Sequence, residues 1–203
     1  MSYDFSWGGF LTRAQPFTVW HLEFLQRMLL ECECVLVIIG STNKEGTKRN
    51  PFSGVLREEM VWEVIDDYFP NDKHRFYVCL LDDQTYENNN NNPDWGEYLC
   101  EHIEGWIGSS RFAFYSGEPK KKLEDWFGKR QGVTLRRLRS RLYVPEGGGS
   151  ATSVRDALTR GDWYLLLQSC PRTVVLRYYE LRDIWLRVLL NPQDDFSASE
   201  TSG

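Results

Sequence analysis

The chain has 203 residues, of which 41% are hydrophobic and 14% aromatic, and this is enough to build a sizeable core and excludes a wholly disordered chain. Its formal net charge of −5, from 24 Lys and Arg against 29 Asp and Glu, argues against a generally basic nucleic-acid-binding protein. A membrane-spanning segment is not expected, because the longest aliphatic run is only Val35 to Ile39. No signal peptide is visible, and the five cysteines are an odd number, which argues against a disulfide framework. A cytoplasmic location is expected instead.

Predicted strands and helices alternate through the first 115 residues. Strands are expected at 6–11, 35–39, 76–81 and 111–115, and helices around 22–29 and at 55–68 and 98–107. The run from Val35 to Ile39 is β-branched throughout most of its length, as expected of a strand that is buried on both faces. Alternation of this kind predicts βαβ units and a parallel sheet with right-handed crossovers.

The remaining chain predicts one more strand and a set of helices. The strand is expected near the end of the segment 133–144, and a Gly-rich turn follows at 145–150. Helices are predicted at 153–159, with Thr152 as the N-cap, and at 163–168 and 174–190. The predicted fold is therefore an α/β, Rossmann-like, doubly wound parallel sheet of about five strands with a C-terminal helical segment. We expect a single domain at 1–194 and a disordered polar tail at 195–203.

The loops that follow the first two strands are the expected ligand site, because doubly wound sheets bind ligands beyond the carboxyl ends of their strands. After the first strand comes the segment Thr12 to His21. Arg13 offers a planar guanidinium that fits phosphate oxygens. Thr18 and His21 are three residues apart at the start of a helix, where both can face one anion.

Three segments in this order resemble the motifs of a known superfamily. Thr12 to His21 resembles the Gly-Arg-Phe-Gln-Pro-Phe-His-x-Gly-His motif of the nucleotidylyltransferases. Ile39 to Ser53, followed by a helix with Arg57, is similar to their second motif, and Ser150 to Arg155 is similar to their Ser-x-Thr-x-x-Arg motif. The loop at 82–95 is a weaker fourth match. The resemblance is closest to the archaeal type of nicotinamide-nucleotide adenylyltransferase.

The resemblance implies an enzyme that joins nicotinamide mononucleotide to the AMP part of ATP, giving NAD and pyrophosphate, with a magnesium ion that is held mostly by ATP and water. It implies that His21 donates a hydrogen bond near the α-phosphate and that Trp95 stacks on the nicotinamide ring. The residues expected to hold the ATP phosphates are Arg13, Thr18, Arg57, Ser150, Thr152 and Arg155, and Arg155 is also expected to take part in catalysis.

Three positions depart from the first motif: Thr12 replaces glycine, Ala14 replaces phenylalanine, and Trp20 replaces the glycine before the histidine. Glycine lets a nucleotide approach the backbone, so Trp20 either covers the adenine as an aromatic lid or occupies nucleotide space. Two alternatives therefore stay open. One is a catalytically silent nucleotide-binding protein on the same fold, and the other is a nucleotidylyltransferase with a different phosphate acceptor.

A cluster of nine Lys and Arg residues lies between positions 120 and 141. We interpret it as a solvated face near the phosphate cleft, because it matches no established nucleic-acid motif. No nucleic-acid partner is expected, and a homo-oligomer is left open.

Overall fold

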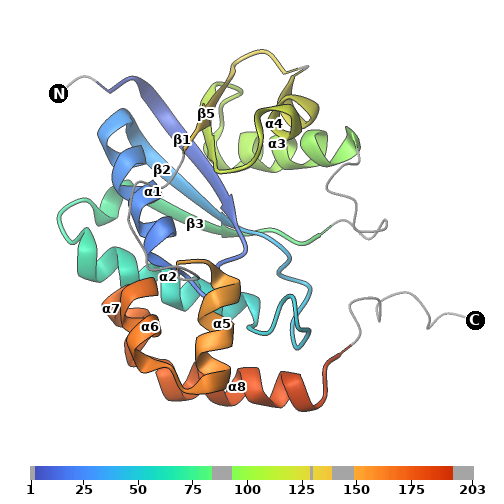
Figure 1. The fold of residues 1–203 in the computed structure, drawn as a ribbon. Coiled ribbons are helices and arrows are strands. Elements are labelled where there is room, and N and C mark those ends of the chain that lie inside the picture. Colours follow the sequence, from blue (N-terminus) through green and yellow to red (C-terminus); the bar gives the residue numbers. More distant parts are fainter. Residues whose placement is uncertain (1–2, 84–92, 129, 139–148, 194–203) are drawn as a thin grey trace, which may run out of the picture.

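The computed structural model describes residues 3–83, 93–128, 130–138 and 149–193. Five strands form one sheet in the order β3-β2-β1-β4-β5, and every neighbouring pair is parallel. Helices cover both faces of the sheet, and the last four helices form a separate layer beside it (Figure 1). The predicted doubly wound α/β fold with a C-terminal helical segment is therefore confirmed. The predicted tail at 195–203 lies outside the described residues.

The strands and helices alternate as expected. The strands are β1 (Phe5–Thr12), β2 (Cys32–Ile39), β3 (Phe76–Leu80), β4 (Phe112–Ser116) and β5 (Val133–Arg137). The helices are α1 (Val19–Glu31), α2 (Gly54–Tyr68), α3 (Pro93–Ile107), α4 (Lys120–Phe127), α5 (Ala151–Arg160), α6 (Trp163–Ser169), α7 (Arg172–Leu176) and α8 (Tyr178–Leu190). A short 3-10 helix, Lys73–Arg75, precedes β3.

The two faces of the sheet carry two hydrophobic clusters, because successive strand residues point to opposite sides. Val35, Val37 and Ile39 of β2 pack with α1, α2 and the C-terminal helices. Leu36 and Ile38, between them in sequence, pack with α3 and α4 on the other face. A continuous apolar run in β2 is therefore required by burial on both sides.

Four local features differ from the sequence prediction. β5 lies at the beginning of the segment 133–144 rather than near its end, because Val133–Arg137 pairs with β4. Helix α4 was not predicted, since its sequence is dominated by charge and buries only Leu123, Trp126 and Phe127. The N-cap of α5 is Ser150, whose hydroxyl accepts from the Ser153 N–H, and not Thr152. The long predicted final helix is divided into α7 and α8 at Arg177, whose guanidinium binds Glu59, Glu63 and Glu180.

The strand order determines where a ligand can bind. The chain runs outward from β1 to β2 and β3, then returns past β1 to form β4 and β5 on the other side. The connections that leave β1 and β4 therefore diverge, which opens a crevice beyond the carboxyl ends of these two strands.

Candidate active site

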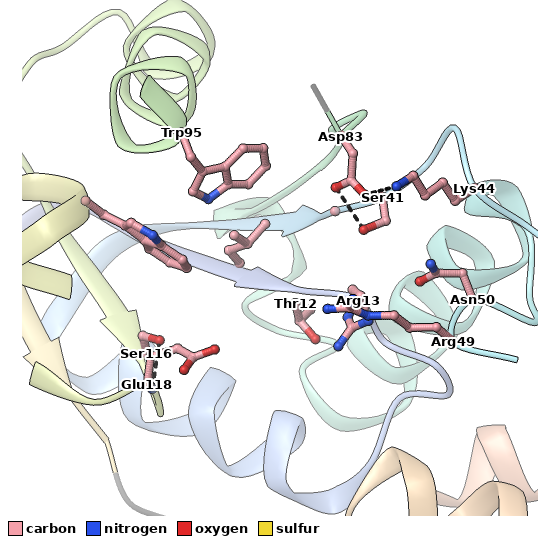
Figure 2. Close-up of a pocket in the computed structure, with 13 residues that line it drawn as sticks. Thr12, Arg13, Ser41, Lys44, Arg49, Asn50, Asp83, Trp95, Ser116 and Glu118 are labelled. Atoms are coloured by element: carbon pink, nitrogen blue, oxygen red, sulfur yellow. Dashed lines mark hydrogen bonds and ion pairs between the residues drawn. The ribbon is translucent and has the colours of Figure 1, made fainter. Parts of the chain in front are cut away.

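A cavity of about 280 Å³ lies beyond the carboxyl ends of β1, β2 and β4 (Figure 2). Its wall combines two tryptophans with polar side chains from three loops. These lining residues are Thr12, Arg13, Ser41, Lys44, Arg49, Asn50, Asp83, Trp95, Ser116, Glu118 and Trp126. The cavity thus lies at the switch point that the strand order defines.

A second cavity, of about 400 Å³, continues the first toward the C-terminal helices. Thr12, Arg13 and Arg49 line both cavities, so the two form one cleft. The second cavity is also lined by His21 and by Thr152 and Arg155 of α5. The first and third sequence motifs, about 130 residues apart in the chain, therefore meet at one site.

His21 is held in one orientation and one protonation state. The backbone N–H of Thr18 donates to Nδ1 of His21 over 2.9 Å, and Thr18 Oγ1 lies 3.0 Å from the same nitrogen. Burial lowers the pKa of His21 from its ordinary 6.5 to about 4, so the ring is neutral at pH 7. Because Nδ1 accepts a hydrogen bond, the proton of the neutral ring is on Nε2. His21 therefore offers an N–H donor at the cleft.

Thr18 itself is buried beneath this histidine, with 1% of its surface exposed. It is the N-cap residue of α1, and with His21 at the third helical position it forms a capping box. It does not line either cavity. The geometry thus gives Thr18 the role of positioning His21, whereas the sequence motif placed it against the ATP phosphates.

Arg57 is fully buried behind the cleft, with 0% of its surface exposed. Its guanidinium donates to backbone carbonyls of the loops after β1 and β2, those of Arg13, Gly40 and Ser41, at 2.7–3.0 Å. Nε also donates to the carbonyls of Phe52 and Ser53.

These bonds occur where the backbone is strained, since Ala14 and Ser41 both have positive φ angles of 47° and 56°. Burial, together with the nearby charge of Arg13, lowers the pKa of Arg57 to about 10. Arg57 therefore binds the loops that form the cleft, which differs from the phosphate contact that the resemblance implied.

Arg155 connects α5 to the loop after β1. One guanidinium nitrogen donates to the Gln15 carbonyl over 2.6 Å, and another lies 3.3 Å from Thr152 Oγ1. Burial, followed by repulsion from Arg13, lowers the pKa of Arg155. Because Arg13 lowers the pKa of both Arg57 and Arg155, the positive charges are close together, and a bound polyanion would relieve their repulsion.

The N-terminus of α5 adds to this positive region. Ser150 caps the helix, while Ala151 and Thr152 in its first turn line the second cavity. Backbone amides and the helix dipole favour an anion at this place. The expected phosphate role of Thr152 agrees with its position, whereas the Ser150 hydroxyl is engaged with Ser153 at 3.0–3.1 Å.

Trp95 lies at the end of the first cavity that is away from Arg13 and Arg49 (Figure 2). It comes from the first turns of α3, is 6% exposed, and lines the cavity together with Trp126 of α4. Its indole N–H has no hydrogen-bond partner among the described residues. The position suits the flat, cationic nicotinamide ring that the resemblance implied as its partner.

Trp20 packs against the turn that precedes α5. A Cβ atom placed on Gly149 would lie 2.7–2.9 Å from its indole ring, and Gly149 has a φ of +80°. Trp20 is absent from the lining of both cavities. The indole therefore supports the N-terminus of α5, and its position favours neither a lid over the nucleotide nor a blocked site.

Several cleft residues were not singled out from the sequence. Arg49 lines both cavities from the loop after β2. Lys44 and Ser41 in the same loop bind the carboxylate of Asp83, at 3.4 and 2.9 Å. Basic residues in a loop at the carboxyl edge of a parallel sheet were a usable signal for Arg49. No local signal identified Glu118, which enters the cavity from beyond β4.

Comparisons with known proteins find relatives by sequence and by fold. No protein-family model matches the chain. The nicotinamide-nucleotide adenylyltransferase of Picrophilus torridus is 26% identical over 150 residues, covering 74% of this chain and 78% of the relative.

Solved structures show the fold. A bifunctional NMN adenylyltransferase/ADP ribose pyrophosphatase of Francisella tularensis, complexed with AMP and a manganese ion, matches 93% of the chain with a TM-score of 0.65 and 17% identity. The chain spans 52% of the length of that protein. The nicotinic acid mononucleotide adenylyltransferase of Plasmodium falciparum, complexed with NaAD, matches 88% of this chain and 97% of its own with a TM-score of 0.56 and 14% identity.

The chain therefore has the fold of solved nucleotide adenylyltransferases, with a cationic cleft at the carboxyl ends of its strands. The resemblance predicted from the motifs is confirmed, since the sequence is similar to an archaeal nicotinamide-nucleotide adenylyltransferase and the two solved structures named above are adenylyltransferases of the same fold. Among the described helices, none has both the length and the apolar character to span a bilayer.

Proposed function

We propose that this chain joins nicotinamide mononucleotide to the adenylyl group of ATP, producing NAD and pyrophosphate. The observation that carries the proposal is the meeting of a neutral His21, with its proton on Nε2, and the cationic side chains of Arg13, Arg49 and Arg155 in one cleft. The predicted activity is borne out by the name of the archaeal relative.

The transfer requires positioning and charge stabilisation more than covalent catalysis. A phosphate oxygen of the mononucleotide attacks the α-phosphorus of ATP, and the bond from that phosphorus to the bridging oxygen of pyrophosphate breaks. His21 Nε2–H donates to an oxygen on which negative charge increases, and Arg13, Arg49 and Arg155 neutralise the phosphates. His21 is neutral in the free chain, and it acts as a donor through Nε2–H and not as a base.

The mononucleotide is placed in the first cavity, with its pyridinium ring against Trp95 and Trp126. A magnesium ion bound to ATP would supply further charge neutralisation and would be held mostly by phosphate oxygens and water. In the described parts of the chain, no three His, Cys, Asp or Glu side chains lie where they could hold a metal ion together. A cytoplasmic location, a single domain at 1–194 and the ligand contacts of His21, Arg13, Thr152, Arg155 and Trp95 are part of this proposal, and a homo-oligomer stays open.

The test uses the purified chain with ATP, nicotinamide mononucleotide and Mg²⁺, and measures NAD and pyrophosphate together. Stoichiometric appearance of both products is expected. Equal inactivity of the folded protein and a blank would contradict the proposal. A panel of other phosphate acceptors, with ATP and CTP, would then separate a different transferase from a silent nucleotide-binding protein, which calorimetry with ATP detects directly.

A further inference from the structure

Glu118 brings a second negative charge to the first cavity, whose other carboxylate, Asp83, is bound by Lys44 and Ser41. It follows β4, and its backbone N–H donates to Ser116 Oγ over 3.1 Å. Figure 2 shows its carboxylate on the side of the cavity away from Arg49 and Lys44, below Trp95 in this view. The cavity is therefore polarised, with Arg49, Lys44 and its partner Asp83 on one side and Glu118 on the other.

Lys122 in α4 forms an ion pair with this carboxylate. Lys122 Nζ lies 3.0 Å from Glu118 Oε1, and the same ammonium lies 5.0 Å from the centre of the Trp126 ring. Lys122 is not a lining residue of the cavity, whereas Glu118 is. One carboxylate oxygen thus faces Lys122, and the other is able to accept a hydrogen bond from a ligand.

The polarity of the cavity sets the direction in which a mononucleotide binds. Its phosphate belongs at the end with Arg13, Arg49 and Lys44, and its flat pyridinium ring belongs beside Trp95 and Trp126. The substituent on that ring then lies near Glu118. This substituent is a carboxamide in nicotinamide mononucleotide and an ionised carboxylate in nicotinic acid mononucleotide.

We propose that Glu118 makes the acceptor site select nicotinamide mononucleotide and reject nicotinic acid mononucleotide, an inference that rests on the proposed function. The carboxamide has N–H donors for the Glu118 carboxylate, while a second carboxylate would be repelled and would leave Glu118 without a ligand donor. Proteins of this fold are named for both mononucleotides: the Francisella tularensis structure for NMN and the Plasmodium falciparum structure for nicotinic acid mononucleotide.

The test compares kcat/KM for both mononucleotides, with ATP in excess, in the wild type and two variants. Glu118→Gln keeps the size and an acceptor but removes the charge, and it is expected to raise kcat/KM for nicotinic acid mononucleotide by about 10- to 100-fold. With nicotinamide mononucleotide kcat/KM for the same variant should fall by a smaller factor, because the glutamine Oε1 still accepts from the carboxamide but without a full charge. Lys122→Met is the matched control: it removes the neighbouring cation and keeps the Glu118 charge, so the preference for the amide should persist or increase.

Direct binding separates this inference from the proposed function. Tryptophan fluorescence measures the affinity of each mononucleotide without turnover, because Trp95 and Trp126 line the cavity. A wild type that binds the amide more tightly than the acid, and loses this preference in Glu118→Gln, supports the specificity role even if no NAD is formed. Conversely, an active enzyme whose preference is the same in wild type and Glu118→Gln, in both kcat/KM and affinity, overturns it.

Discussion

Replacement of His21 by alanine removes two separate interactions, and a second variant separates them. Alanine eliminates the Nδ1 acceptor, which leaves the N–H of the buried Thr18 without its partner, and it eliminates the Nε2–H donor. Asparagine carries its Oδ1 on Cγ, as histidine carries Nδ1, so His21→Asn keeps an acceptor for Thr18. Asparagine has no atom at the position of Nε2. The two variants thus differ in the helix cap and share the loss of the donor.

The expected magnitudes follow from these contacts. Loss of the Thr18 partner is expected to reduce the unfolding free energy of His21→Ala by about 1–3 kcal/mol, and His21→Asn should recover most of this. Loss of a donor to developing phosphate charge should lower kcat by about 100- to 1,000-fold in both variants, with a much smaller effect on ATP binding.

Chemical denaturation gives the stability, single-turnover kinetics with saturating ATP give the rate, and calorimetry gives ATP affinity. A fall in kcat of less than tenfold in both variants would refute the role of the Nε2 donor. A rate that follows stability, low in His21→Ala and normal in His21→Asn, would assign His21 to helix capping alone.

Four further predictions concern the titration of His21 and substitutions at three other residues of the site region. The pKa of His21 is about 4 in the folded chain and near 6.5 when unfolded, so the wild type should lose up to about 3 kcal/mol of unfolding free energy as the pH falls from 7 to 4. Urea denaturation at several pH values measures this loss, which should be absent in His21→Asn. Arg57→Met should destabilise the chain by about 3 kcal/mol or more, because five backbone carbonyls each lose a guanidinium donor; an unchanged denaturation midpoint would contradict this. Arg155→Lys should raise the KM for ATP by about tenfold through loss of the planar guanidinium, and wild-type kinetics would show the motif match to be accidental. Trp20→Gly should cost about 3 kcal/mol of stability and change ATP affinity by less than threefold; a larger rise would indicate a blocked site, and a larger fall an aromatic lid.

The sheet and part of the site could be predicted because their signals are local. The apolar run in β2 indicates burial on both faces, and His21 and Arg155 lie at or near helix starts that follow recognisable motifs. Residues that follow parallel strands lie at the same edge of the sheet whatever the details of packing. For this reason the first and third motifs could be expected at one site from the sequence alone.

Other features depend on which elements become neighbours in space. Arg57 looks from the sequence like any arginine near a helix start, and only the packing of α2 behind the β1 and β2 loops buries it completely. Glu118 reaches the cavity because β4 pairs with β1, although more than a hundred residues separate Glu118 from Thr12. Helix α4, which contributes Trp126, is only eight residues long, and the helical spacing of Leu123, Trp126 and Phe127 was a usable signal that the charged sequence around it obscured.

The contacts of Arg57 have a consequence for variation at this cleft. Among the described residues its guanidinium binds only main-chain oxygens, including those of Arg13, Gly40 and Ser41, and so these bonds do not depend on the side chains carried at these positions. The two loops can therefore exchange their side chains, and with them the ligand they recognise, while the backbone path that shapes the cleft is retained. An arginine buried behind the loops would in this way let one loop framework accommodate different phosphate acceptors.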